Sequence, residues 1–120
     1  DIPNLKLIGP IYDVNKVKAL YKQARLYVHG HSAGGTNPVL AESMWAKLPI
    51  LAFDVSFNKF TTQNEACYYS NSEELIELST MISEETCSNI SENLFLIAES
   101  IYKWEHILSL YEAVLFDENI

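Results

Sequence analysis

Short apolar runs alternate along the chain with segments whose apolar residues recur at helical spacing. Three runs, Leu5–Gly9, Leu26–His29 and Pro49–Phe53, are each bounded by glycine, proline or aspartate and predict three strands. Ala66–Tyr69 predicts a short fourth strand. Because these runs are almost continuously apolar, they fit a parallel sheet with helices on both faces.

Helical spacing is found between the apolar runs. Asp13 is a candidate N-cap for a helix whose apolar stripe includes Val17 and Tyr21. Pro38 stands in the first turn of a second helix, which runs to about Lys47. Both predicted helices connect one strand to the next, as expected for an α/β protein.

The second half of the chain predicts helices after the last strand. The polar stretch Ser56–Glu65 predicts a loop, and Asn71 with Glu74 resembles a capping box at the head of a third helix. After Glu84 the pattern is helical throughout and predicts two further helices. This order predicts a single α/β domain over residues 1–120, in which right-handed crossovers give a short parallel sheet between helical layers, followed by a helical tail.

Composition excludes several classes of protein. With 120 residues, 48% of them apolar and 20% charged, the chain can form a core and is not disordered. Cys67 and Cys87 are too few for a disulfide scaffold, so we expect a reducing compartment. The longest apolar runs, Leu48–Phe53 and Leu94–Ala98, are far shorter than the roughly 20 residues of a membrane span, so we expect a soluble protein. Asp1–Asn4 contains neither an initiator Met nor a targeting signal, so we expect a piece of a longer protein.

The net charge of −8 is unevenly distributed. Residues 1–60 carry seven Lys or Arg and four acids, a net charge of +3, whereas residues 61–120 carry Lys103 against twelve acids, a net charge of −11. No basic stripe with interleaved aromatic residues is present, so nucleic acid is not an expected partner. The distribution is compatible with a small anion bound by the first half, and equally with an acidic tail that only solubilises the fold.

Three predicted loops follow strands and gather at one edge of the sheet, which is where ligands bind in open α/β sheets. They are Gly9–Tyr12, Gly30–Asn37 and Asp54–Glu65. In the middle loop, Gly34 and Gly35 let the backbone approach a ligand closely. That loop leads into a helix N-terminus, whose partial positive charge and free amides suit a phosphate group.

The helix after the middle loop carries a carboxylate, Glu42, about one turn inside it, and Thr36 or Asn37 can cap the helix. A carboxylate accepts hydrogen bonds from a pair of sugar hydroxyls and repels a diphosphate, so Glu42 is a candidate for binding ribose. The alternative interpretation is that Glu42 is a solvated helix residue and that Gly34 and Gly35 form an ordinary turn.

The run Gly30–Met44, followed by Lys47–Asp54, resembles the nucleotide-sugar loop and helix of family 4 glycosyltransferases. It is most similar to the bacterial rhamnosyltransferase-type members that have Gly-Gly-Thr-Asn-Pro at this place. The similarity covers most of the chain, because it extends to Leu7–Tyr12, to Phe57, Asn58, Ala66, Tyr68 and Tyr69, and to Tyr102–Trp104.

The resemblance implies a retaining enzyme of the GT-B architecture, in which two Rossmann-like domains face each other across a cleft. This chain is then part of the carboxyl-terminal domain, which binds the nucleotide-sugar donor, and an acceptor-binding domain lies outside it. The intact enzyme is expected to transfer rhamnose or another hexose to a bacterial surface polysaccharide or lipid-linked acceptor, without a metal or cofactor. We expect it in the cytoplasm or at the inner face of the membrane, and the chain alone to be inactive because part of the cleft is missing.

The resemblance also implies roles for individual residues. Glu42 matches the second of two family glutamates eight residues apart, which binds the ribose, whereas the first falls on Gly34 and is absent. His31 is the candidate substitute for that first glutamate. Gly35, Thr36 and Asn37 are expected to supply the donors that stabilise the departing diphosphate, by about 3 kcal/mol each if oxyanion holes are a guide. No catalytic residue is assigned, since the family's diphosphate-binding Arg and Lys would lie upstream. The expected nucleotide-sugar site comprises His31, Gly34, Gly35, Thr36, Asn37, Glu42 and Asn58.

Other functions remain as alternatives. A GT-B nucleotide-sugar epimerase also has a glycine loop before a helix Glu, and a non-catalytic doubly wound binding module needs no catalytic residue at all. Residues Gly30–Gly34 match the Gly-x-Ser-x-Gly motif of a hydrolase, but they lead into a loop instead of a helix. His29 and His31 alternate in an extended segment, which places their side chains on opposite sides, and no cysteine or carboxylate cluster joins them, so no metal site is expected.

Overall fold

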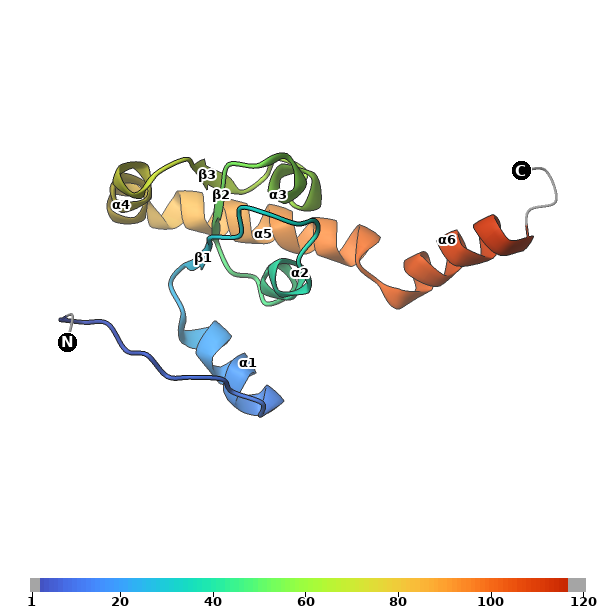
Figure 1. Cartoon of the computed structure of the whole chain (residues 1–120), viewed down its shortest axis with the longest axis horizontal. Helices are drawn as coiled ribbons and strands as arrows, with labels where there is room; N and C mark the ends of the chain where they lie inside the picture. The colour runs from blue at the N-terminus through green and yellow to red at the C-terminus, as the bar shows by residue number, and fades with distance from the viewer. Residues whose placement is uncertain (1–2, 117–120) are drawn as a thin grey trace.

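A computed structural model of the chain describes residues 3–116. Within that range the chain forms three short strands and six helices (Figure 1). The strands are β1 (Tyr27–His29), β2 (Ile50–Phe53) and β3 (Cys67–Tyr69). The helices are α1 (Val14–Gln23), α2 (Pro38–Trp45), α3 (Ser56–Thr61), α4 (Ser72–Met81), α5 (Glu84–Ile101) and α6 (Trp104–Phe116).

The three strands form one parallel sheet in the order β1-β2-β3. In its register, Tyr27 lies opposite Ile50 and Leu51 lies opposite Cys67. Parallel neighbours need a crossover connection, which contains α2 between β1 and β2 and α3 between β2 and β3. The prediction of an α/β fold with a short parallel sheet, flanking helices and a C-terminal helix is confirmed.

The core lies between one face of the sheet and helices α2 and α5, which pack against each other. Ile50 and Ala52 point to this face, because successive side chains of a strand alternate in direction. The cluster consists of Leu40 and Met44 of α2, Ile50 and Ala52 of β2, and Ile90, Leu94 and Ala98 of α5. Each fully buried large aliphatic side chain contributes roughly 2 kcal/mol to folding. The core therefore fixes α2, and with it the loop that precedes α2.

The opposite face of the sheet is only partly covered by the described residues. Leu51 is fully buried there, and α4 packs against β2 and β3. Val28, the register neighbour of Leu51 in β1, has 44% of its surface exposed. The expectation of helices on both faces therefore holds at β2 and fails at β1. An apolar run shows that a strand can be buried, but it does not show that a helix is present to cover it.

The predicted strand Leu5–Gly9 is not formed, and this prediction was wrong. The segment has no regular structure, and Leu7 has 89% of its surface exposed. Figure 1 shows the N-terminal segment and α1 together, apart from the sheet. A strand is stable only when a neighbour pairs with its backbone groups, and no described strand pairs with this segment.

The stretch Ser56–Glu65, predicted as a loop, begins with the helix α3. No side chain caps its N-terminus, and Thr and Asn have low helix propensity, so the local sequence gives no helix signal. Burial stabilises the helix instead, because Asn58, Thr61 and Thr62 are fully buried. The hydroxyls of Thr61 and Thr62 donate to the carbonyls of Phe57 and Asn58, each at 2.7 Å, which allows this burial.

Two of the predicted helix caps are local hydrogen bonds that the structure confirms. Asp13 Oδ1 accepts from Asn15 N (2.9 Å) at the start of α1. Asn71 Oδ1 accepts from Glu74 N (2.9 Å) at the start of α4. The Glu74 carboxylate reaches back to Ser70 N (2.7 Å), one residue before the cap, so the capping box is slightly extended.

Arg25 clamps the other end of α4. Its guanidinium donates to the carbonyl oxygens of Ser79 and Ile82, both at 3.1 Å, and pairs with the Glu84 carboxylate at 3.2 Å. The last carbonyls of a helix have no partner within the helix, and a cation there also interacts favourably with the helix dipole. Arg25 therefore connects the segment before β1 to the junction between α4 and α5.

Helix α6 projects away from the sheet, so the molecule is elongated (Figure 1). Its radius of gyration is 16.5 Å, whereas a compact chain of this length has about 14 Å. α6 has no buried residue and exposes most of its apolar side chains. Tyr102, at the junction of α5 and α6, donates from its hydroxyl to Thr61 O (2.8 Å) in α3. Among the described helices, none is both long enough and apolar enough to cross a membrane.

Candidate functional site

The carboxyl ends of β1 and β2 lead into loop 30–37 and into α3, which lie together at one edge of the sheet. The two segments are joined where the Asn58 side chain donates from Nδ2 to His31 O (3.0 Å). This meeting of two of the predicted loop regions is confirmed. The third, Gly9–Tyr12, contributes Ile11 and Tyr12 to a groove beside α2.

Helix α3 supports loop 30–37 from the interior. Asn58 is fully buried, and its amide donates to His31 O (3.0 Å) and to Phe53 O (2.9 Å). Near the other end of the loop, the hydroxyl oxygens of Thr61 and Thr36 are hydrogen-bonded at 3.3 Å, with Thr36 as the donor because the Thr61 proton is donated to Phe57 O. Asn58, expected from the sequence to belong to the nucleotide-sugar site, lies beneath the loop, and both of its N–H donors are used by the protein.

The N-terminus of α2 uses its own backbone donors. Asn37 Oδ1 accepts from Val39 N (2.9 Å), which confirms the predicted cap. Asn37 O accepts from Leu40 N (3.0 Å) and from Ala41 N (3.4 Å), and Pro38 has no N–H. The expectation of free amides in the first turn of α2 was therefore wrong, because the cap and the first turn consume them.

The free donors belong to loop 30–37. Within the described residues, the backbone N–H groups of Gly34, Gly35, Thr36 and Asn37 donate no hydrogen bond. Gly34 has φ +107°, a conformation that side-chain-bearing residues rarely adopt. A Cβ added at Gly35 would meet nothing within 4 Å, so the backbone is open there. Four adjacent unpaired amides on an exposed loop form a candidate anion-binding segment.

His31 is exposed, and its ring lies beside Gly34. A Cβ built on Gly34 would be 3.6 Å from His31 Nε2, so the imidazole occupies the space beside that glycine. His31 Nδ1 is 3.5 Å from Asn37 Nδ2. His31 was expected at the site only because it is close in sequence, and the structure brings it together with Gly34 and Asn37.

The neighbouring His29 is buried, in contrast to His31. Its Nδ1 is hydrogen-bonded to Tyr27 OH (3.2 Å), and its Nε2 has no partner among the described residues. The two imidazole rings are stacked, with centroids 5.8 Å apart and planes at 25°. The expectation that they point to opposite sides was wrong, because the chain leaves the strand after His29. Burial lowers the pKa of His29, and the adjacent His31 ring lowers it further.

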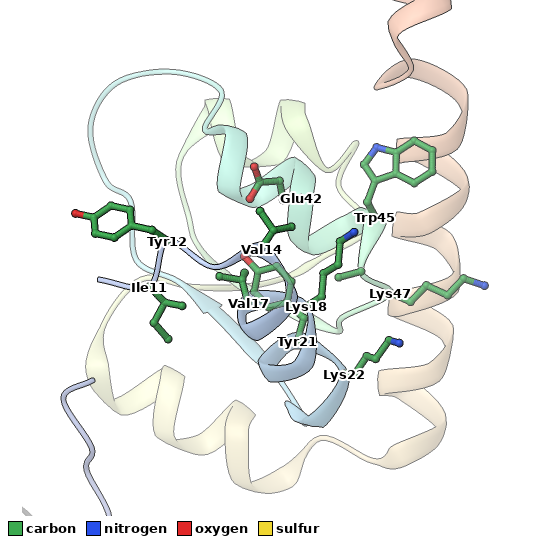
Figure 2. Close-up of a pocket in the computed structure, with 11 residues that line it drawn as sticks. Ile11, Tyr12, Val14, Val17, Lys18, Tyr21, Lys22, Glu42, Trp45 and Lys47 are labelled. Carbon is green, nitrogen blue, oxygen red and sulfur yellow. The ribbon is translucent and has the colours of Figure 1, made fainter. Parts of the chain in front are cut away.

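A groove of about 790 Å³ lies between α1 and α2 (Figure 2). Its wall is largely apolar, and its lining residues include Tyr12, Tyr21 and Trp45. Lys18, Lys22 and Lys47 also line it, which makes the groove a positively charged place on an acidic protein. The volume is within the range of small-molecule sites, about 300–1,000 Å³. Sequence reasoning missed this groove, since it depends on how α1 is placed beside α2.

Glu42 is exposed on α2 and borders the same groove (Figure 2). Its negative charge is close enough to raise the pKa of Tyr21, although burial is the larger cause of that shift. Within residues 3–116, no Lys, Arg or His side chain forms an ion pair with Glu42. The carboxylate is therefore free to accept hydrogen bonds from a ligand in the groove.

No family model, no curated protein and no solved structure matches the chain. Among the described residues, no group of three or more His, Cys, Asp or Glu side chains is arranged to hold a metal ion. The candidate site therefore consists of the unpaired amides of Gly34 to Asn37 and the imidazole of His31, with the Glu42 carboxylate at the border of the groove beside α2.

Proposed function

We propose that this chain is the donor-binding part of a retaining glycosyltransferase of the GT-B architecture, with a Rossmann-like fold. The observation that carries the proposal is that the amides of Gly34 to Asn37, in loop 30–37 at the carboxyl edge of a parallel sheet, are unpaired within the described residues. Backbone N–H groups that need no rearrangement are suited to a diphosphate, whose negative charge increases as the sugar departs.

The groove beside α2 is the proposed place for the nucleoside. Its volume of about 790 Å³ is sufficient for a base and a ribose, and the Tyr12 ring offers a flat apolar surface for stacking. Glu42, at the border of the groove, accepts the two ribose hydroxyls. Gly34 stands where the family has its other glutamate, and His31 fills the space beside it at the diphosphate end of the site.

The intact enzyme is proposed to transfer rhamnose or another hexose to a surface polysaccharide or a lipid-linked acceptor. The sugar leaves with retention at the anomeric carbon, and the departing nucleoside diphosphate is stabilised by the loop amides. Since the acceptor would bind to a second domain, we expect this chain to bind the donor without turnover. Turnover near that of an intact enzyme would contradict this part of the proposal.

The test is a titration of the ¹⁵N-labelled chain with a nucleoside diphosphate, followed by amide chemical shifts. We expect shifts at Gly34–Asn37 and around Glu42. The substitution Glu42→Gln should weaken the binding of nucleoside diphosphate about tenfold, as expected for the loss of hydrogen bonds to a charged group. It should leave the affinity for inorganic pyrophosphate unchanged. Glu112→Gln, in α6, is the matched control and should change neither affinity. Unchanged amides in loop 30–37 at millimolar ligand would overturn the proposal and favour a non-catalytic binding module.

A further inference from the structure

The two nitrogens of the His31 ring have different surroundings. Nδ1 is 3.5 Å from the side-chain nitrogen of Asn37, a long hydrogen bond. Nε2 has no hydrogen-bond partner among the described residues and lies beside Gly34, 3.6 Å from the position of a Cβ on that glycine. A neutral imidazole carries one proton, and the partner of one nitrogen decides which nitrogen holds it.

The orientation of the Asn37 amide decides this question. Its Oδ1 accepts from Val39 N (2.9 Å) as the cap of α2, so its other atom, Nδ2, faces His31. Nδ2 is a donor and has no lone pair to offer. His31 Nδ1 must therefore accept the hydrogen bond, which places the ring proton on Nε2. The Asn37 side chain thus both caps α2 and determines which nitrogen of the neutral His31 ring carries the proton.

The buried His29 ring stacks on the His31 ring, with their centroids 5.8 Å apart. In the same loop, the backbone N–H groups of Gly34 to Asn37 donate no hydrogen bond within the described residues. With its proton on Nε2, the ring presents an N–H beside Gly34, whose own amide is unpaired.

We propose that Asn37 is a positioning residue, which holds His31 as the Nε2–H tautomer and so gives loop 30–37 a fifth neutral donor. The ligand class for this donor is a diphosphate oxygen, and that part rests on the proposed function. The tautomer depends only on the hydrogen bonds within the chain. Asn37 does not touch the ligand through its side chain, and His31 does.

The tautomer is tested by long-range ¹H–¹⁵N correlation of the imidazole in the full chain at pH 8, above the ordinary histidine pKa. We expect Nε2 to be the protonated nitrogen and Nδ1 the unprotonated one. Asn37→Asp retains a cap for Val39 N–H but places an acceptor opposite Nδ1, so the proton should move to Nδ1. A wild-type ring protonated at Nδ1, or an Asn37→Asp spectrum identical to the wild type, overturns the inference.

The ligand contact is tested with inorganic pyrophosphate. His31→Phe removes the donor and should weaken the binding of pyrophosphate at least tenfold. His31→Gln retains an N–H, and its pyrophosphate affinity should stay within about threefold of the wild type. Equal affinities for the two variants would overturn the contact. If the wild-type chain binds no pyrophosphate, both the ligand assignment and the proposed function are overturned. If His31 is instead protonated at Nδ1, only the positioning role of Asn37 is overturned.

Discussion

Asn58 gives the sharpest test of how loop 30–37 is held in place. The substitution Asn58→Ala removes two hydrogen bonds, to His31 O at 3.0 Å and to Phe53 O at 2.9 Å, from a fully buried position. Each bond contributes about 1 kcal/mol net, and a buried carbonyl left unpaired costs about 1–3 kcal/mol. Phe53 O keeps a second bond from Val55 N, so only His31 O loses its sole donor among the described residues.

The buried Oδ1 of Asn58 has no partner in the described residues, and its removal offsets part of this cost. The expected loss is about 2–3 kcal/mol of unfolding free energy. With an m value of about 1.5 kcal/mol/M, the urea midpoint should fall by about 1.3–2 M. The assay is urea unfolding followed by circular dichroism. Amide hydrogen exchange in loop 30–37 should also become faster, since the loop loses its support.

The matched control is Asn89→Ala, an exposed asparagine of α5 for which no side-chain hydrogen bond is found within residues 3–116. It should change the unfolding free energy by less than about 0.5 kcal/mol. If Asn58→Ala were as mild as the control and instead weakened nucleotide binding, Asn58 would be a ligand contact. Asn58 would then not be the support of the loop.

Three further predictions concern other parts of the molecule. Arg25→Ala should lower the free energy of unfolding by about 1 kcal/mol, because the carbonyls of Ser79 and Ile82 lose their donor. An unchanged urea midpoint would show that water replaces the guanidinium without loss of stability. Burial lowers the pKa of His29 in the folded chain, so the unfolded chain binds a proton at this imidazole more readily. The contribution of His29 to the free energy of unfolding is therefore fully present above the ordinary histidine pKa of about 6.5 and declines as the pH falls below it. His29→Gln should remove that part of the decline in urea midpoints between pH 8 and 5, and an unaltered slope would contradict the assignment. A chain that ends at Lys103 should unfold at nearly the same urea concentration as the full chain, because α6 has no buried residue. A large fall in the urea midpoint would show that α6 stabilises the fold through packing.

The sequence predicted those elements whose stability depends on neighbouring residues. Asp13, Asn37 and Asn71 cap helices through hydrogen bonds two or three residues along the chain, which local patterns specify. Leu5–Gly9 has a strand pattern but depends on a distant partner, so the same reasoning failed there. α3 was missed because its stability comes from buried threonine and asparagine side chains that pair with carbonyls.

The same distinction applies to the candidate site. The glycine pair, the cap and Glu42 are consecutive along one loop and helix, and the sequence placed them together. The support from Asn58 to His31 O spans 27 residues, and the groove needs α1 beside α2, so neither has a local signal. The stacking of His29 on His31 was missed because the bend after β1 is a property of the loop conformation.

Helix α3 has only six residues, yet it carries hydrogen bonds in two directions. Through Asn58 and Thr61 it supports loop 30–37, and through Thr61 O it receives the hydroxyl of Tyr102 at the base of α6. The loop and the base of α6 are therefore both joined to the same short helix. A substitution that unfolds α3 is expected to loosen both segments at once.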